Sequence, residues 1–162
     1  MITTKLLWLV ALLSLTFALM ACSGEDASDR AAEGAALVEQ GRWQEAIVEL
    51  DLAIDQYITN IGYQKTTGRH AAAKVIEFEE AEALVDRSTA HMELGQSQLA
   101  LKDLDKAVKL RPDYAPAYAN RALVQTRLGK DAEAEQDVSQ AASLGYDVTG
   151  LQRSIDNLKA AR

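Results

Sequence analysis

Two stretches of this chain repeat each other at an offset of 34 residues. When residues 81–110 are aligned without gaps on residues 115–144, nine of the thirty pairs are identical. The identical pairs are Ala81/Ala115, Ala83/Ala117, Arg87/Arg121, Leu94/Leu128, Gly95/Gly129, Ala100/Ala134, Asp103/Asp137, Ala107/Ala141 and Leu110/Leu144. A fixed period in the mid-thirties is the signature of stacked helical repeats.

Each repeated stretch predicts a helix, a turn and a second helix. Small and apolar residues recur at helical spacing on both sides of one glycine, Gly95 or Gly129, and glycine tolerates the positive φ of a tight turn. We expect helices at 97–110, 115–128 and 131–144, with Asp113 and Asp131 as N-caps.

These residues resemble the tetratricopeptide repeat (TPR). The second unit matches its pattern at Leu84, Ser88, Gly95, Ala100, Leu104, Ala107 and Pro112, and the third at Tyr118, Ala122, Gly129, Ala134, Val138 and Ala141. The third unit departs from the pattern by closing with Gly145-Tyr146 in place of proline. The resemblance implies an all-α solenoid of helix-turn-helix TPR units, in which alanines let paired helices approach closely.

A TPR domain is therefore expected over residues 30–162, built from units of unequal regularity. Its expected parts are a degenerate unit at 30–57 with helices at 30–40 and 43–57, an insertion at 58–80, units at 81–114 and 115–146, and a C-terminal capping helix at 149–161. The capping helix carries Leu151, Ile155 and Leu158 at helical spacing, and a solenoid needs such a helix to cover its last apolar face.

The insertion interrupts the period, because the turn glycines Gly41 and Gly95 are 54 residues apart. Residues 58–68 contain two glycines and β-branched residues without a helical stripe, and are interpreted as a loop. Residues 69–94 contain neither glycine nor proline, so the next helix is expected to begin about three turns early. Those extra turns either cover the N-terminal helix pair or overhang the groove and hold a partner.

The N-terminus resembles a bacterial lipoprotein signal peptide. Residues 6–20 form a fifteen-residue apolar run, shorter than the roughly 20 residues that span a bilayer. The run ends in Leu19-Met20-Ala21-Cys22, which resembles a lipobox, although Met20 is bulkier than the usual residue. We therefore expect a signal peptide at 1–21, and a lipidated Cys22 followed by an acidic tether at 22–29.

The resemblance to a lipoprotein implies a membrane anchor through the acylated Cys22. The alternatives are an uncleaved anchor and an ordinary secretory signal in which Cys22 has no role. Because Ser23 follows the cysteine, the outer membrane is favoured over the inner membrane if the cell has two. The expected location is the cell envelope.

Charge and residue types exclude several classes of function. A net charge of −7 disfavours nucleic acid, and a single cysteine cannot form an intrachain disulfide. The two histidines, His70 and His91, have no metal-ligand spacing, and no nucleophile or phosphate-binding motif is present. We expect no catalytic residues, no cofactor, no metal and no small-molecule substrate. The acidic run at 77–82 is interpreted as a solvated face.

The expected function is therefore protein binding. By position in the repeat, the groove would be lined by Val85, Thr89, Met92, Glu93, Ala119, Asn120, Leu123, Thr126 and Arg127. This surface suits an apolar or helical partner. The family members that grip a terminal carboxylate need lysine and asparagine where this chain has Val85 and Thr89, so that clamp is broken.

Two functions remain open. The first is a membrane-anchored TPR lipoprotein that acts as an interaction scaffold in the bacterial cell envelope and binds a partner peptide or helix in its groove. The alternative is a self-associating structural envelope protein whose groove is filled intramolecularly.

Overall fold

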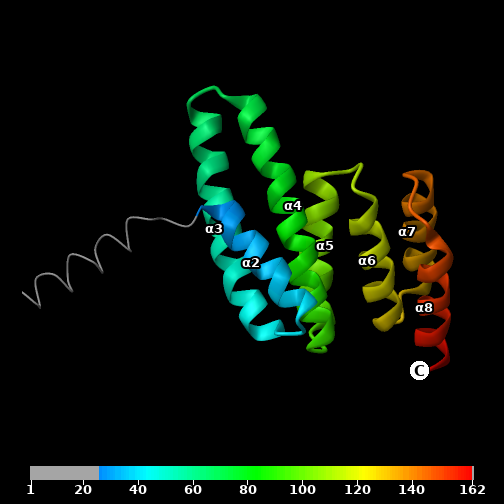
Figure 1. Cartoon of the computed structure of the whole chain (residues 1–162). Coiled ribbons are helices and arrows are strands. Elements are labelled where there is room, and N and C mark those ends of the chain that lie inside the picture. Colours follow the sequence, from blue (N-terminus) through cyan, green and yellow to red (C-terminus); the bar gives the residue numbers. More distant parts are fainter. Residues whose placement is uncertain (1–25, 162) are drawn as a thin grey trace, which may run out of the picture.

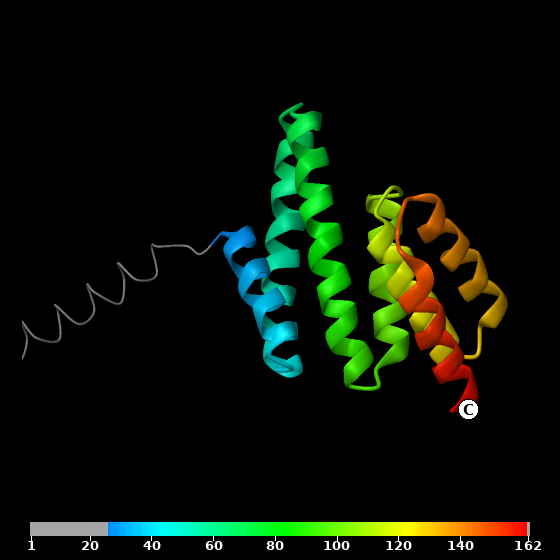
Figure 2. The ribbon, with the colours of Figure 1, turned by 45° about the vertical axis from the view of Figure 1, so that its right-hand side comes forward.

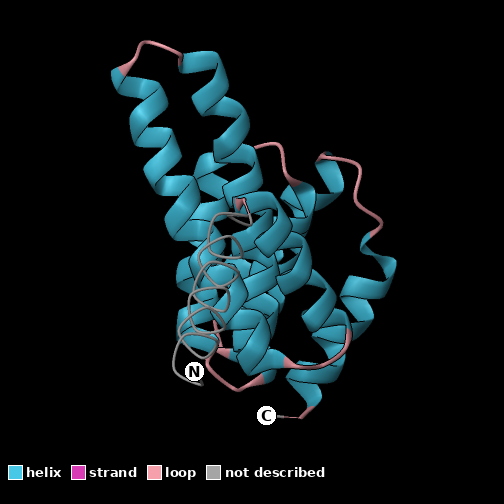
Figure 3. Cartoon of the chain, turned by 60° about the vertical axis from the view of Figure 1, so that its left-hand side comes forward, coloured by secondary structure: helices cyan, strands magenta, loops and turns pink. Residues whose placement is uncertain are grey.

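The described part of the chain is entirely helical. A computed structural model describes residues 26–161, and it shows no strand among them (Figures 1 and 3). Its helices are α2 (Ala27–Glu39), α3 (Trp43–Thr66), α4 (His70–Glu93), α5 (Ser97–Leu110), α6 (Ala115–Arg127), α7 (Asp131–Ser143) and α8 (Val148–Ala160). The predicted all-α helical repeat fold is confirmed. The predicted signal peptide and Cys22 lie outside the described residues.

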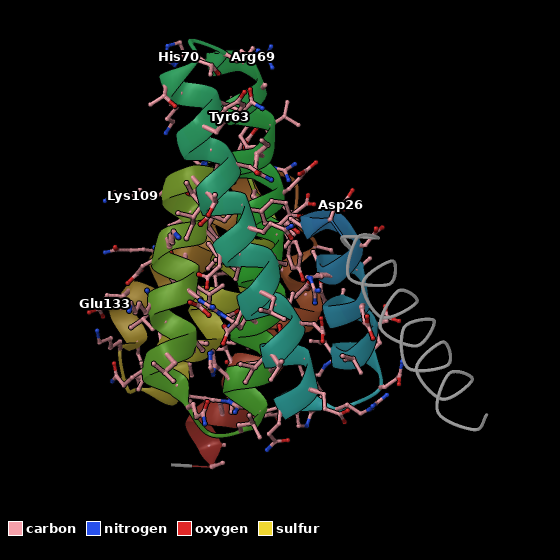
Figure 4. The ribbon with its side chains drawn as sticks, turned by 90° about the vertical axis from the view of Figure 1, so that its left-hand side faces the viewer. Asp26, Tyr63, Arg69, His70, Lys109 and Glu133 are labelled. Carbon is pink, nitrogen blue, oxygen red and sulfur yellow. The ribbon has the colours of Figure 1, made fainter. Side chains whose placement is uncertain are left out.

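The helices form two layers. Helices α2, α4, α6 and α8 contact one another in that order, and we call them the first-helix layer. Each of α3, α5 and α7 pairs with the helix that precedes it in the chain. Lys109 of α5 and Glu133 of α7 accordingly lie on the opposite side of the molecule from Asp26 at the start of α2 (Figure 4). The capping helix α8 occupies the place that the first helix of a fourth unit would take.

The same turn connects the two helices in each of the three units. Gly41, Gly95 and Gly129 have φ values of 71°, 73° and 75°. In each turn the backbone N–H of the residue after the glycine donates a hydrogen bond to the carbonyl oxygen five residues before it, at 2.9 Å or less. In the second unit, for example, Gln96 N donates to His91 O. This arrangement satisfies carbonyls at the helix end and needs a left-handed residue, which glycine supplies without strain.

Small residues form the contacts between paired helices. Alanines 46, 100 and 134 open the second helices and are at most 1% exposed, as are alanines 53, 107 and 141 one to two turns later. Leucines fill the space between neighbouring pairs, with Leu50, Leu84 and Leu104 all fully buried. Gly34 marks the closest approach, because a Cβ built there would lie 2.5 Å from Leu50 Cγ. The alanine spacing thus explains how closely the helices pack.

A repeated arginine bridge joins neighbouring units. Arg87 makes a bidentate contact with Asp103, from Nε at 2.8 Å and Nη2 at 2.6 Å, and its Nη1 donates to Asp51 on α3 of the preceding unit. Arg121 repeats the bidentate contact with its own Asp137, and its Nη1 reaches Asp105 on α5 at 3.0 Å. Each arginine therefore ties the second helix of its own unit to that of the unit before.

The prediction that residues 58–68 form a loop is wrong. Helix α3 continues to Thr66, and only residues 67–69 separate it from α4. The extension is stabilised because Tyr57 and Ile61 are buried against α4, whose Ala73 is also buried, and because Lys65 Nζ lies 2.7 Å from a Glu77 carboxylate oxygen. The glycine within it, Gly62, faces open space and does not end the helix.

The inserted residues therefore form a helical hairpin. The early start of α4 is confirmed at His70. The free end of the hairpin extends past the other helices (Figures 1 and 2), and Tyr63, Arg69 and His70 lie there (Figure 4). The extra turns of α4 pack on the extended α3, which belongs to the N-terminal pair.

The predicted N-caps are also wrong. Tyr114 and Lys130 cap α6 and α7, neither with a side-chain hydrogen bond, so Asp113 precedes its cap and Asp131 lies within the first turn. Side-chain caps occur at the two outer helices instead. Asp26 accepts hydrogen bonds from Ser28 N and Asp29 N at 2.9 and 3.0 Å, and Asp147 accepts one from Thr149 N at 3.0 Å. Helix α2 begins at Ala27 and therefore includes the last residues of the expected tether.

The arginine bridge should contribute measurably to stability. In an Arg87→Met variant the Asp103 side chain, 7% exposed, loses its bidentate partner in a site that water reaches poorly. We expect a loss of about 3 kcal/mol in the free energy of unfolding, measured by urea titration. Arg42→Met, which removes an exposed pair with Glu45, should cost much less, because solvent screens an exposed ion pair. Equal losses in the two variants would show that the bridge has no special role.

Candidate functional site

A pocket lies in the first-helix layer where α4 ends. Its volume is about 380 Å³, and it is lined by Met92, Glu93, Leu123, Arg127, Ser154, Asn157 and Leu158. We call it the C-terminal pocket. Three helices contribute to it, because α8 packs on α6 beside the last turn of α4. The walls are apolar where Met92, Leu123 and Leu158 meet, and the other four residues provide a polar rim.

The structure divides the nine predicted groove residues into three groups. Met92, Glu93, Leu123 and Arg127 line the C-terminal pocket. Thr89 and Asn120 are partly buried and lie outside that lining. Val85, Ala119 and Thr126 are at most 5% exposed and support the surface from beneath. Ala119 shares a core cluster with Leu151 and Ile155 of α8, so the capping helix itself covers this part of the expected groove.

Arg127 is held in place by the end of α4. Its Nη1 donates to the Met92 carbonyl oxygen at 2.7 Å, and its Nη2 lies 3.6 Å from a Glu93 carboxylate oxygen. The last carbonyls of a helix have no partner within the helix, and a cation there also interacts favourably with the helix dipole. The guanidinium therefore fixes α6 against α4 at the edge of the pocket, with part of its hydrogen-bonding capacity already used.

Sequence reasoning missed the contribution of α8 to this pocket. Ser154 and Asn157 are polar residues of the capping helix, and the repeat pattern assigns them no role. Leu158 was expected in the buried stripe, but it is only partly buried and lines the pocket. The sequence did contain one signal for this contribution. The apolar stripe of the capping helix continues to Leu158, about one turn beyond Leu151 and Ile155, and these two residues are the ones that are buried.

A second hollow lies at the other end of the first-helix layer. Its volume is about 270 Å³, and it is lined by Ser28, Ala31, Ala32 and Ala35 of α2, Tyr57 of α3, and Glu79, Glu82, Ala83 and Asp86 of α4. We call it the acidic cleft. An adjoining hollow of about 240 Å³ shares Ser28, Tyr57 and Glu79 with it. The three acidic residues of the cleft all come from α4.

The acidic run at 77–82 is therefore not a uniform solvated face. Glu80 is 2% exposed and pairs with Lys106, while Glu77 pairs with Lys65. Glu82 pairs with Arg111, and Glu79 lines the acidic cleft. A helix places neighbouring residues about 100° apart, so four acidic residues close in sequence point to different surroundings.

Asp86 has the most perturbed carboxyl group in the cleft. Burial raises its pKa to about 6, and the negative charges of Glu82 and Glu39 add to the effect. Ionisation of Asp86 at neutral pH therefore opposes folding. Its folded-state pKa lies above the unfolded value, so the folded protein binds more protons between about pH 4 and 6, and stability falls as the pH rises through that range.

The described residues, 26–161, include no group of histidine, cysteine, aspartate and glutamate arranged to hold a metal ion. His91 is a packed side chain, 12% exposed, with Nδ1 2.6 Å from Gln96 Oε1 and Nε2 3.9 Å from Asp103. Among the described helices, none combines the length and apolar character needed to cross a membrane.

The cost of the Asp86 charge can be measured. An Asp86→Asn variant should be more stable than the wild type by about 1–2 kcal/mol at pH 7.5, because it removes a charge that folding desolvates. This gain should shrink by more than half at pH 4.5, where the folded wild type already holds the proton. Urea unfolding at both pH values tests this. Asp55→Asn, at an exposed site on α3, is the control and should shift stability by less than about 0.5 kcal/mol. A gain independent of pH would contradict the explanation.

Comparison with known sequences supports the repeat assignment. Residues 89–129 match a family model described as a TPR repeat. Tetratricopeptide repeat protein 36 of Xenopus tropicalis is 32% identical over 134 residues, which cover 75% of this chain. The chain spans 64% of the length of that curated relative.

Comparison with solved structures supports the same fold. The first TPR domain of Spaghetti (RPAP3), bound to the HSP90 peptide SRMEEVD, has a TM-score of 0.64 at 20% identity, covering 85% of this chain and 93% of that one. The C-terminal TPR-containing domain of a Plasmodium falciparum FK506-binding protein has a TM-score of 0.66 at 20% identity, covering 85% and 88%. At these identities the likeness concerns the fold. The sequence match and the fold together support a TPR protein.

Proposed function

We propose that this chain is a membrane-anchored interaction scaffold that binds a peptide or helix of a protein partner on its first-helix layer. The observation that carries the proposal is the C-terminal pocket, an apolar hollow with a polar rim formed by three helices. Such a hollow matches the recognition of an amphipathic segment, in which one apolar side chain anchors and flanking polar groups align it. The function is binding without catalysis.

The partner segment is proposed to present an apolar side chain to Met92, Leu123 and Leu158. Two structures of similar fold, the first and second TPR domains of Spaghetti, are bound to an HSP90 peptide, which supports peptide binding as the class of function. Recognition here should differ from a grip on a terminal carboxylate. The nearest cation in the pocket, Arg127, is already bonded to Met92 O and close to Glu93.

The anchor is proposed to be a lipid on Cys22, with the protein in the cell envelope and the outer membrane favoured. The sequence around Cys22 supports this, and the net charge of −7 adds a physical reason for an acyl group. An acidic protein is repelled by anionic headgroups, so lipid chains must provide the attachment, each buried CH₂ contributing about 0.8 kcal/mol. The described helices begin at Ala27, a few residues after the proposed anchor.

A photoreactive residue at position 123 tests the binding surface. In native membranes, irradiation of the full-length protein carrying this residue should yield an adduct with another protein, because Leu123 lines the pocket. The same residue at position 99 is the control, since Leu99 is 48% exposed on α5, outside the first-helix layer. Equal adducts at both positions, or an adduct made only with a second copy of the chain, would contradict the proposal. Mass spectrometry identifies the adduct.

The anchor is tested by metabolic labelling with a palmitate analogue. The wild-type chain should incorporate the label, whereas Cys22→Ala should not, because the thiol is the group that would be alkylated. Incorporation of equal label by both chains would rule out Cys22 as the lipid attachment site. The helical domain should be unaffected, so circular dichroism should be the same for both proteins.

A further inference from the structure

The acidic cleft contains polar groups that the fold leaves without partners. Tyr57 is 3% exposed and borders both adjoining hollows, yet its hydroxyl makes no hydrogen bond with any residue between 26 and 161. Asp86 and Glu79 likewise have no hydrogen bond or ion pair within the described residues. The ring of Tyr57 is buried, but its hydroxyl is not fully enclosed, so it opens into the hollows, where a ligand group can reach it.

The cleft is negatively charged at neutral pH. Burial raises the pKa of Tyr57 to about 12, with Glu79, Asp26 and Glu82 adding to the effect, so its hydroxyl stays neutral. Arg111, the cation that pairs with Glu82 of the cleft, also has a second contact. It contacts Glu82 at 2.5 Å and stacks over the Tyr114 ring at 4.5 Å from the centroid. A positively charged group with N–H donors would pair with the groups that have no partner among residues 26–161, which are the Asp86 and Glu79 side chains and the Tyr57 hydroxyl.

The walls of the cleft define the shape of that group. Methyl groups of Ala31, Ala32 and Ala35 on α2 face Ala83 on α4, so the sides are apolar and narrow. A lysine or arginine side chain has an apolar stem and a cationic head, which matches a cleft lined by alanines together with carboxylates and a hydroxyl. A metal ion fits less well, because no described acidic residues are grouped to coordinate one.

We propose that the acidic cleft binds a lysine or arginine side chain of the protein partner. The proposal rests on the proposed function to the extent that the partner segment lies along the first-helix layer. Asp86 precedes Glu93 of the C-terminal pocket by seven residues on α4, which is about two turns and about 10 Å along the helix axis, so the two residues lie on the same side of the helix. A segment that places an apolar residue in the C-terminal pocket can therefore also place a basic residue in the cleft. The two sites together would select partners by charge and spacing.

A peptide titration tests the cleft directly. The full-length protein, labelled with ¹⁵N and purified in detergent, is titrated with three capped pentapeptides that differ only in the central residue: arginine, lysine or citrulline, a neutral isostere of arginine, each flanked by alanines. We expect saturating amide shifts in residues 28–35 and 79–86 with the two basic peptides, and at least five-fold weaker binding of the citrulline peptide. This contrast isolates the positive charge as the recognised feature.

Variants assign the interaction to named groups. Asp86→Asn should reduce the affinity for the arginine peptide to that for citrulline, and Tyr57→Phe should reduce it two- to five-fold. Both variants should remain folded, because the Tyr57 hydroxyl has no partner to lose and the Asp86 charge opposes folding. Unchanged or raised unfolding midpoints, measured in parallel, separate lost binding from lost structure. Asp55→Asn on α3 is the control and should bind like the wild type.

Three results would overturn the proposal. They are equal shifts with the citrulline peptide, the same shifts produced by calcium ions alone, and shifts that follow protein concentration without any peptide, which would place a second copy of the chain in the cleft. The test is independent of the C-terminal pocket. If the titration fails while position 123 still forms its adduct, only the cleft proposal is wrong; if position 123 fails as well, the binding function itself is wrong.

Discussion

The close approach of paired helices is the constraint on which this structure depends. Alanines 46, 100 and 134 are at most 1% exposed and sit where second helices meet first helices. A larger side chain at such a position would separate the pair and lose contact along its whole length, because protein interiors are packed with few voids. The turn glycines follow from the same constraint, since two helices that touch need a short connection.

Close packing also determines where charge can be buried. The bidentate contacts of Arg87 and Arg121 join the first helix of a unit to its second helix, and Nη1 of each arginine reaches the second helix of the unit before. Asp103 and Asp137 are each about 7% exposed in their side chains and are compensated. Asp86, the residue before Arg87 on α4, has no charged partner of opposite sign among the described residues. Asp103 and Asp137 are thus paired with arginines, whereas Asp86 has no such partner and lines the acidic cleft.

Much of the fold could be predicted from the sequence, because the evidence for it is local. The identity of Arg87 and Arg121, and of Asp103 and Asp137, was visible at the offset of 34 residues, but their pairing was not, because it joins residues sixteen positions apart on different helices. The loop predicted at 58–68 failed for a related reason. Its residues are poor helix formers in isolation, and α3 is continued there by burial of Tyr57 and Ile61 against α4, which a single segment cannot reveal.

The sequence by itself determined the period, the helical class, the turn glycines and the small residues between helices, since each depends on neighbours within one unit. Tertiary structure alone decided which predicted groove residues reach the surface. Val85, Ala119 and Thr126 follow the repeat pattern but are covered, whereas Leu158 of α8 completes a pocket with Met92 and Leu123. The physical reason is that exposure depends on what packs above a residue. The residues that cover it belong to helices distant in the chain. The spacing of residues within one helix does not indicate which distant helix packs on it.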